Sequence, residues 1–189
     1  MRLFIALDIP ADIRERLSQY VDRVRCYAPE ARWARIESLH VTLKFVGEVK
    51  DAKVEEIKAA LPAIQCSPFP VEFKETGFFP APRSARVFWA GVHASDTLPQ
   101  LASSIETAVE KLGIPREKRA YHAHLTLARA PEGSGSKHCF RLLQEHLSAE
   151  EAPQFGTMTA REFFLYQSQI MRGGARYTKL QRYSLESPH

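Results

Sequence analysis

The sequence carries one short pattern of polar and apolar residues twice, at positions 84 residues apart. His40-Val41-Thr42-Leu43 recurs as His124-Leu125-Thr126-Leu127. The chain has only seven histidines in 189 residues, so chance is a poor explanation for two His-x-Thr-Leu segments. The repeat indicates an internal duplication, which restricts the chain to folds built from two similar halves.

Apolar patterns on both sides of each motif repeat at the same offset. An apolar run of strand length and a helical stripe precede each motif, and a second helix and strand follow it. The matched pairs are residues 3–6 with 87–90, Leu17 with Leu101, helices that begin near Asp51 and near Ser136, and residues 71–73 with 155–157. Each half therefore predicts strand, helix, strand, helix, strand, and residues 176–185 predict one closing strand after a turn at Gly173-Gly174.

This order of elements predicts a mixed α/β (α+β) fold with two pseudo-symmetric lobes. We expect two antiparallel-type sheets, with helices on their outer faces, around a central cleft. The chain is then a single domain over residues 1–189, whose internal repeat covers approximately 1–84 and 85–168. A chain of this length can bury a sizeable core without disulfides or a structural metal.

Strand periodicity divides each motif between two faces. Residues i and i+2 of a strand share a face, so His40 and Thr42 point one way while Val41 and Leu43 point the other. The second motif divides in the same way. Because the apolar residues take the core face, we expect each histidine and its threonine on a second, polar face. The alternative is a pair of ordinary core strands inherited through duplication.

Two imidazoles that converge on one cleft are suited to paired proton transfer. One can withdraw a proton from a nucleophile while the other protonates a leaving oxygen. Each threonine lies about 7 Å along the strand from its histidine, and its hydroxyl can donate a hydrogen bond to a phosphate oxygen. This combination predicts phosphodiester chemistry without an obligatory metal.

Six stretches, two of which contain the motifs, carry a wider similarity. They are residues 2–7, 32–33 ahead of 39–47, 86–92, 124–129 and 174–177. On these residues and the two motifs, the sequence resembles the 2H phosphoesterase superfamily, which is defined by two His-x-Thr-x motifs. Within that superfamily it is similar to the bacterial and archaeal RNA 2′,3′-cyclic phosphodiesterases, first described as 2′-5′ RNA ligases. The similarity covers nearly the whole chain.

The resemblance implies a bilobal fold in which the two motifs face each other across the cleft. It implies hydrolysis of an RNA terminal 2′,3′-cyclic phosphodiester to a 2′-phosphomonoester, with reversible 2′-5′ ligation at the same site. His40 is then the proton donor to the departing 3′ oxygen, and His124 is the proton acceptor that activates water. The residues alone leave these two roles interchangeable. No cofactor and no metal ion is implied.

The resemblance also places an aromatic residue and an arginine at the cleft. Phe45 and Arg129 match them, each five residues after its histidine, with Thr42 and Thr126 as the other phosphate-binding residues. Phe45 can stack on a terminal base, and Arg129 can pair with phosphate charge. Strict alternation, however, puts both side chains on the core face. A ligand role therefore requires each strand to end or bulge first; otherwise Phe45 is a core aromatic.

The composition of the chain limits the kinds of binding partner and the cellular compartment that we expect. The formal net charge of +4 permits an anionic partner without identifying one. Three widely separated cysteines argue against a disulfide scaffold and a cysteine zinc site, and they favour a reducing compartment. No apolar stretch approaches the ~20 residues that span a bilayer. We expect a cytoplasmic monomer that binds RNA ends or nucleotides with a 2′,3′-cyclic phosphate, and no membrane.

Three alternatives stay open at this point. One is a 2H phosphodiesterase for a small cyclic or 2′-5′-linked nucleotide, and another is a non-catalytic RNA-binding module. The third is a metal site at His122 and His124, whose i, i+2 spacing permits chelation. No third ligand stands nearby in sequence, and Ser38 occupies the position equivalent to His122, so we expect no metal there.

Overall fold

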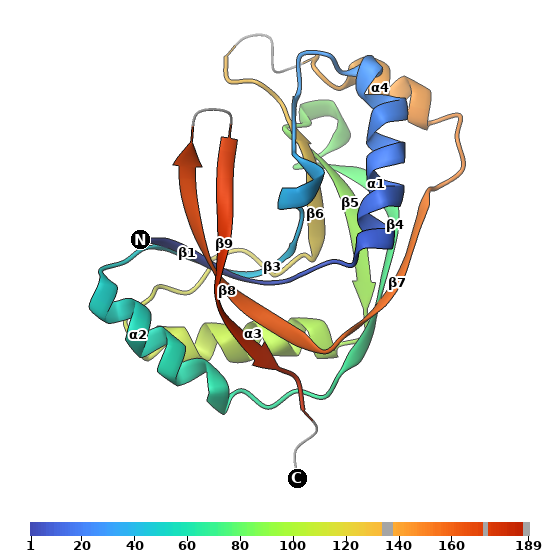
Figure 1. Cartoon of the computed structure of the whole chain (residues 1–189). Helices are drawn as coiled ribbons and strands as arrows, with labels where there is room; N and C mark the ends of the chain where they lie inside the picture. Colours follow the sequence, from blue (N-terminus) through green and yellow to red (C-terminus); the bar gives the residue numbers. More distant parts are fainter. Residues whose placement is uncertain (134–137, 172–173, 187–189) are drawn as a thin grey trace.

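The computed structural model of the chain describes residues 1–133, 138–171 and 174–186 (Figure 1). Its elements, in chain order, are β1 (Arg2–Leu7), α1 (Ala11–Val24), β2 (Arg32–Trp33), β3 (Val41–Glu48), α2 (Asp51–Ala60), β4 (Phe69–Phe79), β5 (Val87–Ala94), α3 (Thr97–Glu110), β6 (His124–Arg129), α4 (Arg141–Leu147), β7 (Gln154–Ala160), β8 (Glu162–Met171) and β9 (Gly174–Ser184). The predicted helix start near Ser136 and Gly173 of the predicted turn lie outside the described residues.

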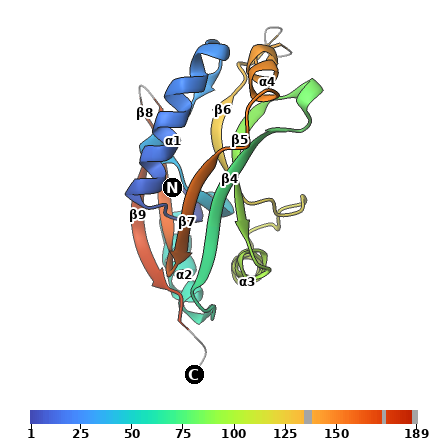
Figure 2. The same cartoon turned by 90° about the vertical axis from the view of Figure 1, so that its right-hand side faces the viewer.

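Two antiparallel sheets organise the molecule, which confirms the predicted fold class (Figures 1 and 2). The first sheet has the strand order β3-β1-β8-β9, and the second has the order β2-β6-β5-β4-β7. The predicted closing strand corresponds to β9. Strand β8 was not predicted, yet it lies beside β1 as β4 lies beside β5. Within the described residues, no helix is long and apolar enough to cross a membrane.

The offset of 84 does not carry through to the third strand of each half. It matches residues 71–73 with 155–157, but these segments belong to β4 and β7, which pair with each other in the second sheet. The position equivalent to β4 in the first sheet is held by β8. The two halves of the chain therefore exchange strands instead of each building its own sheet.

The first strand of each half also departs from that offset, by one residue. The relevant cross-strand pairs are Thr42 with Ala6 and Thr126 with Trp89. Ala6 and Trp89 are therefore equivalent, at an offset of 83. Because a one-residue slip turns every side chain to the other face of the sheet, Phe4 and Phe88 lie in different places. Phe88 is buried in the main core, whereas Phe4 packs on the opposite face of its sheet.

One contiguous apolar core joins both sheets. Helix α1 of the first half packs against β7 of the second sheet (Figure 2). Helix α3 of the second half packs against β3 of the first sheet. The ring of Tyr20 on α1 contacts the ring of Phe155 on β7 edge to face, at 5.2 Å between centroids. Each of these two helices therefore packs on a strand from the other half of the chain, and the apolar core is formed by both halves together.

A buried ion pair connects β3 to α3. The Lys44 side chain is only 3% exposed, and its Nζ lies 2.8 Å from Oε1 of Glu106. The same ammonium group donates a hydrogen bond of 2.7 Å to the carbonyl oxygen of Pro115. This cluster fixes the first motif strand against the helix of the opposite half.

Replacing Lys44 by methionine should lower the free energy of unfolding by about 3–5 kcal/mol, because it leaves the Glu106 carboxylate buried without its cation. Urea denaturation measures this change. The double variant Lys44→Met, Glu106→Leu should recover most of the loss, since apolar replacement of both partners is often neutral. As a control, Lys53→Met removes only a surface pair with Glu56 and should cost less than about 1 kcal/mol. Equal stability of Lys44→Met and the parent would contradict the assignment.

Candidate active site

Each motif strand contains a β-bulge at the leucine that follows its threonine. The pairing of β3 with β1 skips Leu43, and the pairing of β6 with β5 skips Leu127. At a bulge, two residues of one strand oppose a single residue of the other, so the alternation of faces shifts by one. Leu43 and the next residue, Lys44, are therefore both buried. The two bulges occur at equivalent positions of the repeat.

The bulges bring Phe45 and Arg129 onto the face that carries the histidines. Phe45 lies opposite Phe4, and Arg129 lies opposite Val87, on the side of each sheet away from the main core. Phe45 is 62% exposed, which rules out a core aromatic at this position. Each strand therefore bulges before Phe45 or Arg129, as a role of these residues in binding the substrate requires.

Both histidines are held by the same backbone contact. Nδ1 of His40 lies 2.8 Å from the carbonyl oxygen of Ser38, and Nδ1 of His124 lies 2.8 Å from that of His122. A carbonyl oxygen only accepts, so Nδ1 is the donor and carries the proton. The Nε2 atom of each neutral ring is then the acceptor, and it becomes a donor when the ring is protonated. This is the arrangement that acid–base catalysis needs.

Aromatic rings contact both imidazoles. His40 stacks on Phe4 with 4.4 Å between ring centroids, and the ring of Tyr177 meets it edge on at 5.2 Å. His124 contacts the ring of Phe79 edge to face at 5.1 Å. Desolvation by these neighbours disfavours the charged form of each histidine.

Burial, assisted by the Arg14 guanidinium, lowers the pKa of His40 to about 4, although the Ser38 hydrogen bond and Asp8 oppose this shift. Burial also lowers the pKa of His124. The hydrogen bond to the His122 carbonyl opposes this shift, and the Arg129 guanidinium adds to it. Both rings are therefore mainly neutral at pH 7 in the free protein. The deeper shift at His40 distinguishes two histidines that the sequence makes equivalent.

The low pKa of His40 predicts how stability changes with pH. The unfolded chain, with an ordinary histidine pKa of 6.5, binds a proton that the folded protein excludes until the pH approaches about 4. The contribution of His40 to the free energy of unfolding is therefore fully present above pH 6.5. A fall to pH 4 should remove on the order of 3 kcal/mol of this contribution. Urea unfolding of the parent and of His40→Gln across this interval isolates the effect. Identical pH dependence in the two proteins would contradict the burial of a neutral His40.

A hydrogen bond joins the segment before the second motif to a residue of the first motif. The Tyr121 hydroxyl, three residues before His124, donates to the carbonyl oxygen of Thr42 at 3.2 Å. Strand β3 also contacts β6 directly. Burial raises the pKa of Tyr121, so its hydroxyl keeps the proton that it donates. Sequence reasoning missed this contact, because a backbone carbonyl acceptor leaves no signature in the sequence.

An ionic cluster beside His40 was likewise not predicted. The Asp8 carboxylate lies 2.5 Å from the side chains of both Arg14 and Lys179. Although burial raises it, these two cations together hold the pKa of Asp8 below its ordinary value. Arg14 also donates to the carbonyl oxygen of Ile36 at 2.7 Å and so anchors the segment that leads to His40. A pocket of about 260 Å³ opens here, lined by Asp8, Arg14, Glu37, Ser38, Leu39, His40, Tyr166, Tyr177 and Lys179.

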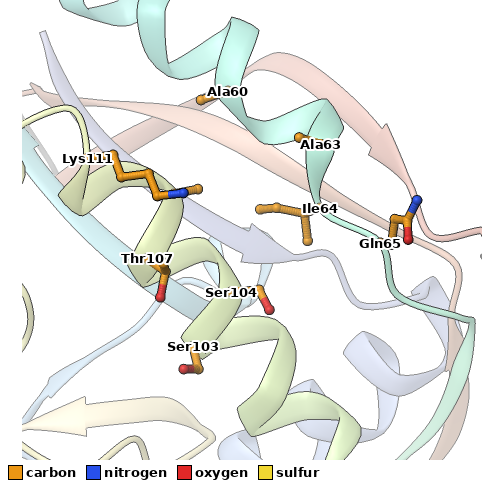
Figure 3. A pocket seen from close by; sticks show the side chains of 9 residues that line it. Ala60, Ala63, Ile64, Gln65, Ser103, Ser104, Thr107 and Lys111 are labelled. Atoms are coloured by element: carbon orange, nitrogen blue, oxygen red, sulfur yellow. The ribbon is translucent and has the colours of Figure 1, made fainter.

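A second pocket, of about 350 Å³, lies between the end of α2 and α3 (Figure 3). Alanine, serine and threonine side chains make up most of its lining, and Lys111 supplies its only charge. It therefore brings no acid–base pair together. Across the described ranges 1–133, 138–171 and 174–186, no group of three or more His, Cys, Asp or Glu side chains is arranged to hold a metal ion.

Known proteins resemble this chain over almost its full length. The family described as LigT like Phosphoesterase matches residues 7–89 and 92–177. An RNA 2′,3′-cyclic phosphodiesterase of Archaeoglobus fulgidus is 33% identical over 180 residues, covering 95% of this chain and 98% of the relative. A protein of the same name from Escherichia coli (strain K12) is 31% identical over 192 residues, covering 97% and 96%.

Solved structures resemble the fold over the same span. TT0787 of Thermus thermophilus has a TM-score of 0.80 at 28% identity and covers 100% of both chains. E. coli LigT complexed with 3′-AMP has a TM-score of 0.79 at 31% identity and covers 97% of both chains.

Proposed function

This chain belongs to the LigT-like phosphoesterase family, and from that premise we propose that it hydrolyses the 2′,3′-cyclic phosphodiester at an RNA end to a 2′-phosphomonoester. The observation that carries the proposal is the matched pair His40 and His124. Each ring is fixed through Nδ1 to a backbone carbonyl, so each leaves Nε2 for proton transfer. Relatives named RNA 2′,3′-cyclic phosphodiesterase over nearly the full chain support the choice of substrate.

In the proposed reaction, water attacks phosphorus while Nε2 of His124 accepts one of its protons. The bond between phosphorus and the 3′ oxygen breaks, and Nε2 of protonated His40 supplies the proton that makes the 3′ hydroxyl. Phosphorus gains the oxygen of water and keeps the 2′ oxygen, which gives a 2′-phosphomonoester. His124 ends the reaction protonated and His40 neutral, so exchange with solvent resets the pair.

The phosphate itself explains how His40 can serve as the acid. With a pKa of about 4, this ring is neutral in the free protein at pH 7. A phosphodiester anion beside an imidazole favours its charged form and raises its pKa. Substrate binding therefore prepares the donor. Thr42 lies on the histidine-bearing side of the first sheet, and Thr126 and Arg129 lie on that side of the second sheet. Their hydroxyls and the guanidinium are proposed to bind the phosphate oxygens.

The reverse reaction uses the same groups. If the 5′ hydroxyl of a second RNA replaces water, His124 removes its proton and a 2′-5′ linkage forms as the 3′ oxygen leaves. In this proposal, the exposed ring of Phe45 stacks on the terminal base.

The chain is also proposed to act as a monomer in the cytoplasm. Cys26, Cys66 and Cys139 are all free thiols, which is the usual state in a reducing compartment. Size-exclusion chromatography with light scattering tests the monomer, and a dimer mass would contradict it.

Incubation of a cyclic-ended RNA oligomer with the protein tests the proposed activity. In water enriched in oxygen-18, the oligomer should gain the mass of one labelled water, with the label in its terminal phosphate. The same RNA with a 3′-phosphomonoester end should stay unchanged. An unaltered cyclic end at high protein concentration would contradict the proposal, and unlabelled product would contradict direct attack by water.

A further inference from the structure

Two arginines stand directly opposite each other on neighbouring strands. Arg32 of β2 pairs with Arg129 of β6, and Arg129 pairs in turn with Val87 of β5. Cross-strand partners in an antiparallel sheet share one face. Arg32 therefore lies on the face that carries His124 and Thr126, at the edge of the second sheet.

This arrangement costs stability in the free protein. Like charges directly opposite each other in a sheet are destabilising. The contacts of these two arginines with carboxylates offset little of this repulsion. Arg32, 62% exposed, approaches Glu132 only to 3.8 Å, and that carboxylate is 94% exposed. Such surface contacts contribute little. Arg129 makes no ion pair or side-chain hydrogen bond within the part of the chain that the structure describes. The two cations thus form a site that an anion would complete.

The two guanidinium groups have different relations to the reacting centre. Arg129 lies on the face of the second sheet that carries His124, and it is close enough to lower the pKa of that ring, so in the proposed reaction it is the arginine that meets the reacting phosphate. Arg32 lies one strand further out, on β2 at the edge of the sheet. A single cyclic phosphate carries one negative charge, which Arg129 already meets. Arg32 is left for a second anion.

We propose that Arg32 binds the backbone phosphate on the 5′ side of the terminal nucleotide, and that the site therefore selects a polynucleotide end over a mononucleotide. This inference rests on the proposed function and names its substrate class. The terminal nucleotide of an RNA chain bears one such phosphate at its 5′ oxygen, whereas a nucleoside 2′,3′-cyclic phosphate has none. Arginine is suited to this contact because its planar fork of donors matches phosphate oxygens.

Two substrates with the same terminal nucleotide test this assignment: uridine 2′,3′-cyclic phosphate and an RNA trimer with that end. The parent should show a higher kcat/KM for the trimer. Arg32→Gln should lower kcat/KM for the trimer by about ten- to hundredfold, the value of a charge-assisted hydrogen bond. It should change turnover of the mononucleotide by less than about twofold. Arg141→Gln, equally exposed on α4 and paired with Glu145, is the matched control and should change neither.

Salt dependence supplies a readout that a structural role would not move. For the trimer, log kcat/KM should decrease with log salt concentration, and the magnitude of this negative slope should be smaller by about 0.7 in Arg32→Gln. This difference corresponds to one lost phosphate contact on a single strand. Loss of the like-charge pair should also leave the melting temperature of the variant equal to or above that of the parent.

The outcomes distinguish failure of the proposed role of Arg32 from failure of the proposed phosphodiesterase activity. Equal loss on both substrates, or no loss on either, would overturn the role of Arg32 while the phosphodiesterase activity stands. That role is also overturned if the parent turns over the mononucleotide as well as the trimer. If the parent opens neither cyclic phosphate, the proposed function itself fails.

Discussion

Replacing His40 or His124 by alanine should lower kcat for a cyclic RNA end by about 10²–10⁴-fold in each case. Each substitution removes one of the two Nε2 atoms that we propose exchange protons with the reacting oxygens, and no other group in the described site is held in the same way to replace it. The double variant should be little worse than either single variant, because groups that act as a unit are strongly non-additive.

Binding should survive both substitutions. The dissociation constant for an oligomer with a 2′-phosphate end should change by only a few fold, since the threonines and Arg129 remain. His93→Ala is the matched control: this histidine of β5 is 44% exposed beside Glu75, and its loss should leave kcat unchanged. Parental turnover by either active-site alanine variant would refute paired-histidine catalysis.

Replacing Arg129 by methionine should lower kcat/KM by about 10²–10³-fold, the effect of removing one donor from charge that develops in a transition state. Methionine keeps much of the length of the side chain and removes its charge. Arg129→Lys should recover part of the loss, because it restores the charge but not the planar fork.

A second measurement separates this electrostatic role from a structural one. Arg129 lowers the pKa of His124, so Arg129→Met should raise that pKa, as followed by NMR titration of the imidazole. Arg129→Lys should restore the lower value. An unchanged pKa together with unchanged kcat/KM would show that the guanidinium does not act at this site.

Local strand geometry made the polar face predictable. The alternation that separates His40 and Thr42 from Val41 and Leu43 follows from the backbone alone and holds in both halves. The bulge at Leu43 could not be predicted, since leucine carries no turn signal. From the sequence, a bulge could be named only as the condition for a ligand role of Phe45. The bulge is seen only in the register of β3 against β1, which the local sequence does not give.

Strand β8 escaped prediction because it does not alternate. Phe163, Phe164, Leu165 and Tyr166 are all buried. Phe163 and Leu165 belong to the main core, whereas Phe164 and Tyr166 join the cluster around Phe4 on the other face. A strand covered on both faces loses the period of two.

The groups that tune the site come from distant parts of the chain. Arg14 of α1 and Lys179 of β9 meet Asp8, which follows β1, beside His40. The offset of 84 could not reveal them, because the two halves exchange strands and the environments of the two histidines differ. The deeper burial of His40 is a consequence of that asymmetry.

The position of the phosphate in the product is the most direct test of the account. Phosphorus-31 NMR of a cyclic-ended RNA oligomer with the protein, in the presence of a chelator, follows the cyclic resonance and identifies the monoester that replaces it. Protonation of the 3′ oxygen by His40 predicts a 2′-phosphomonoester alone, at a rate that the chelator does not change. A 3′-phosphomonoester, or a cyclic end that stays intact once metal is removed, would contradict it.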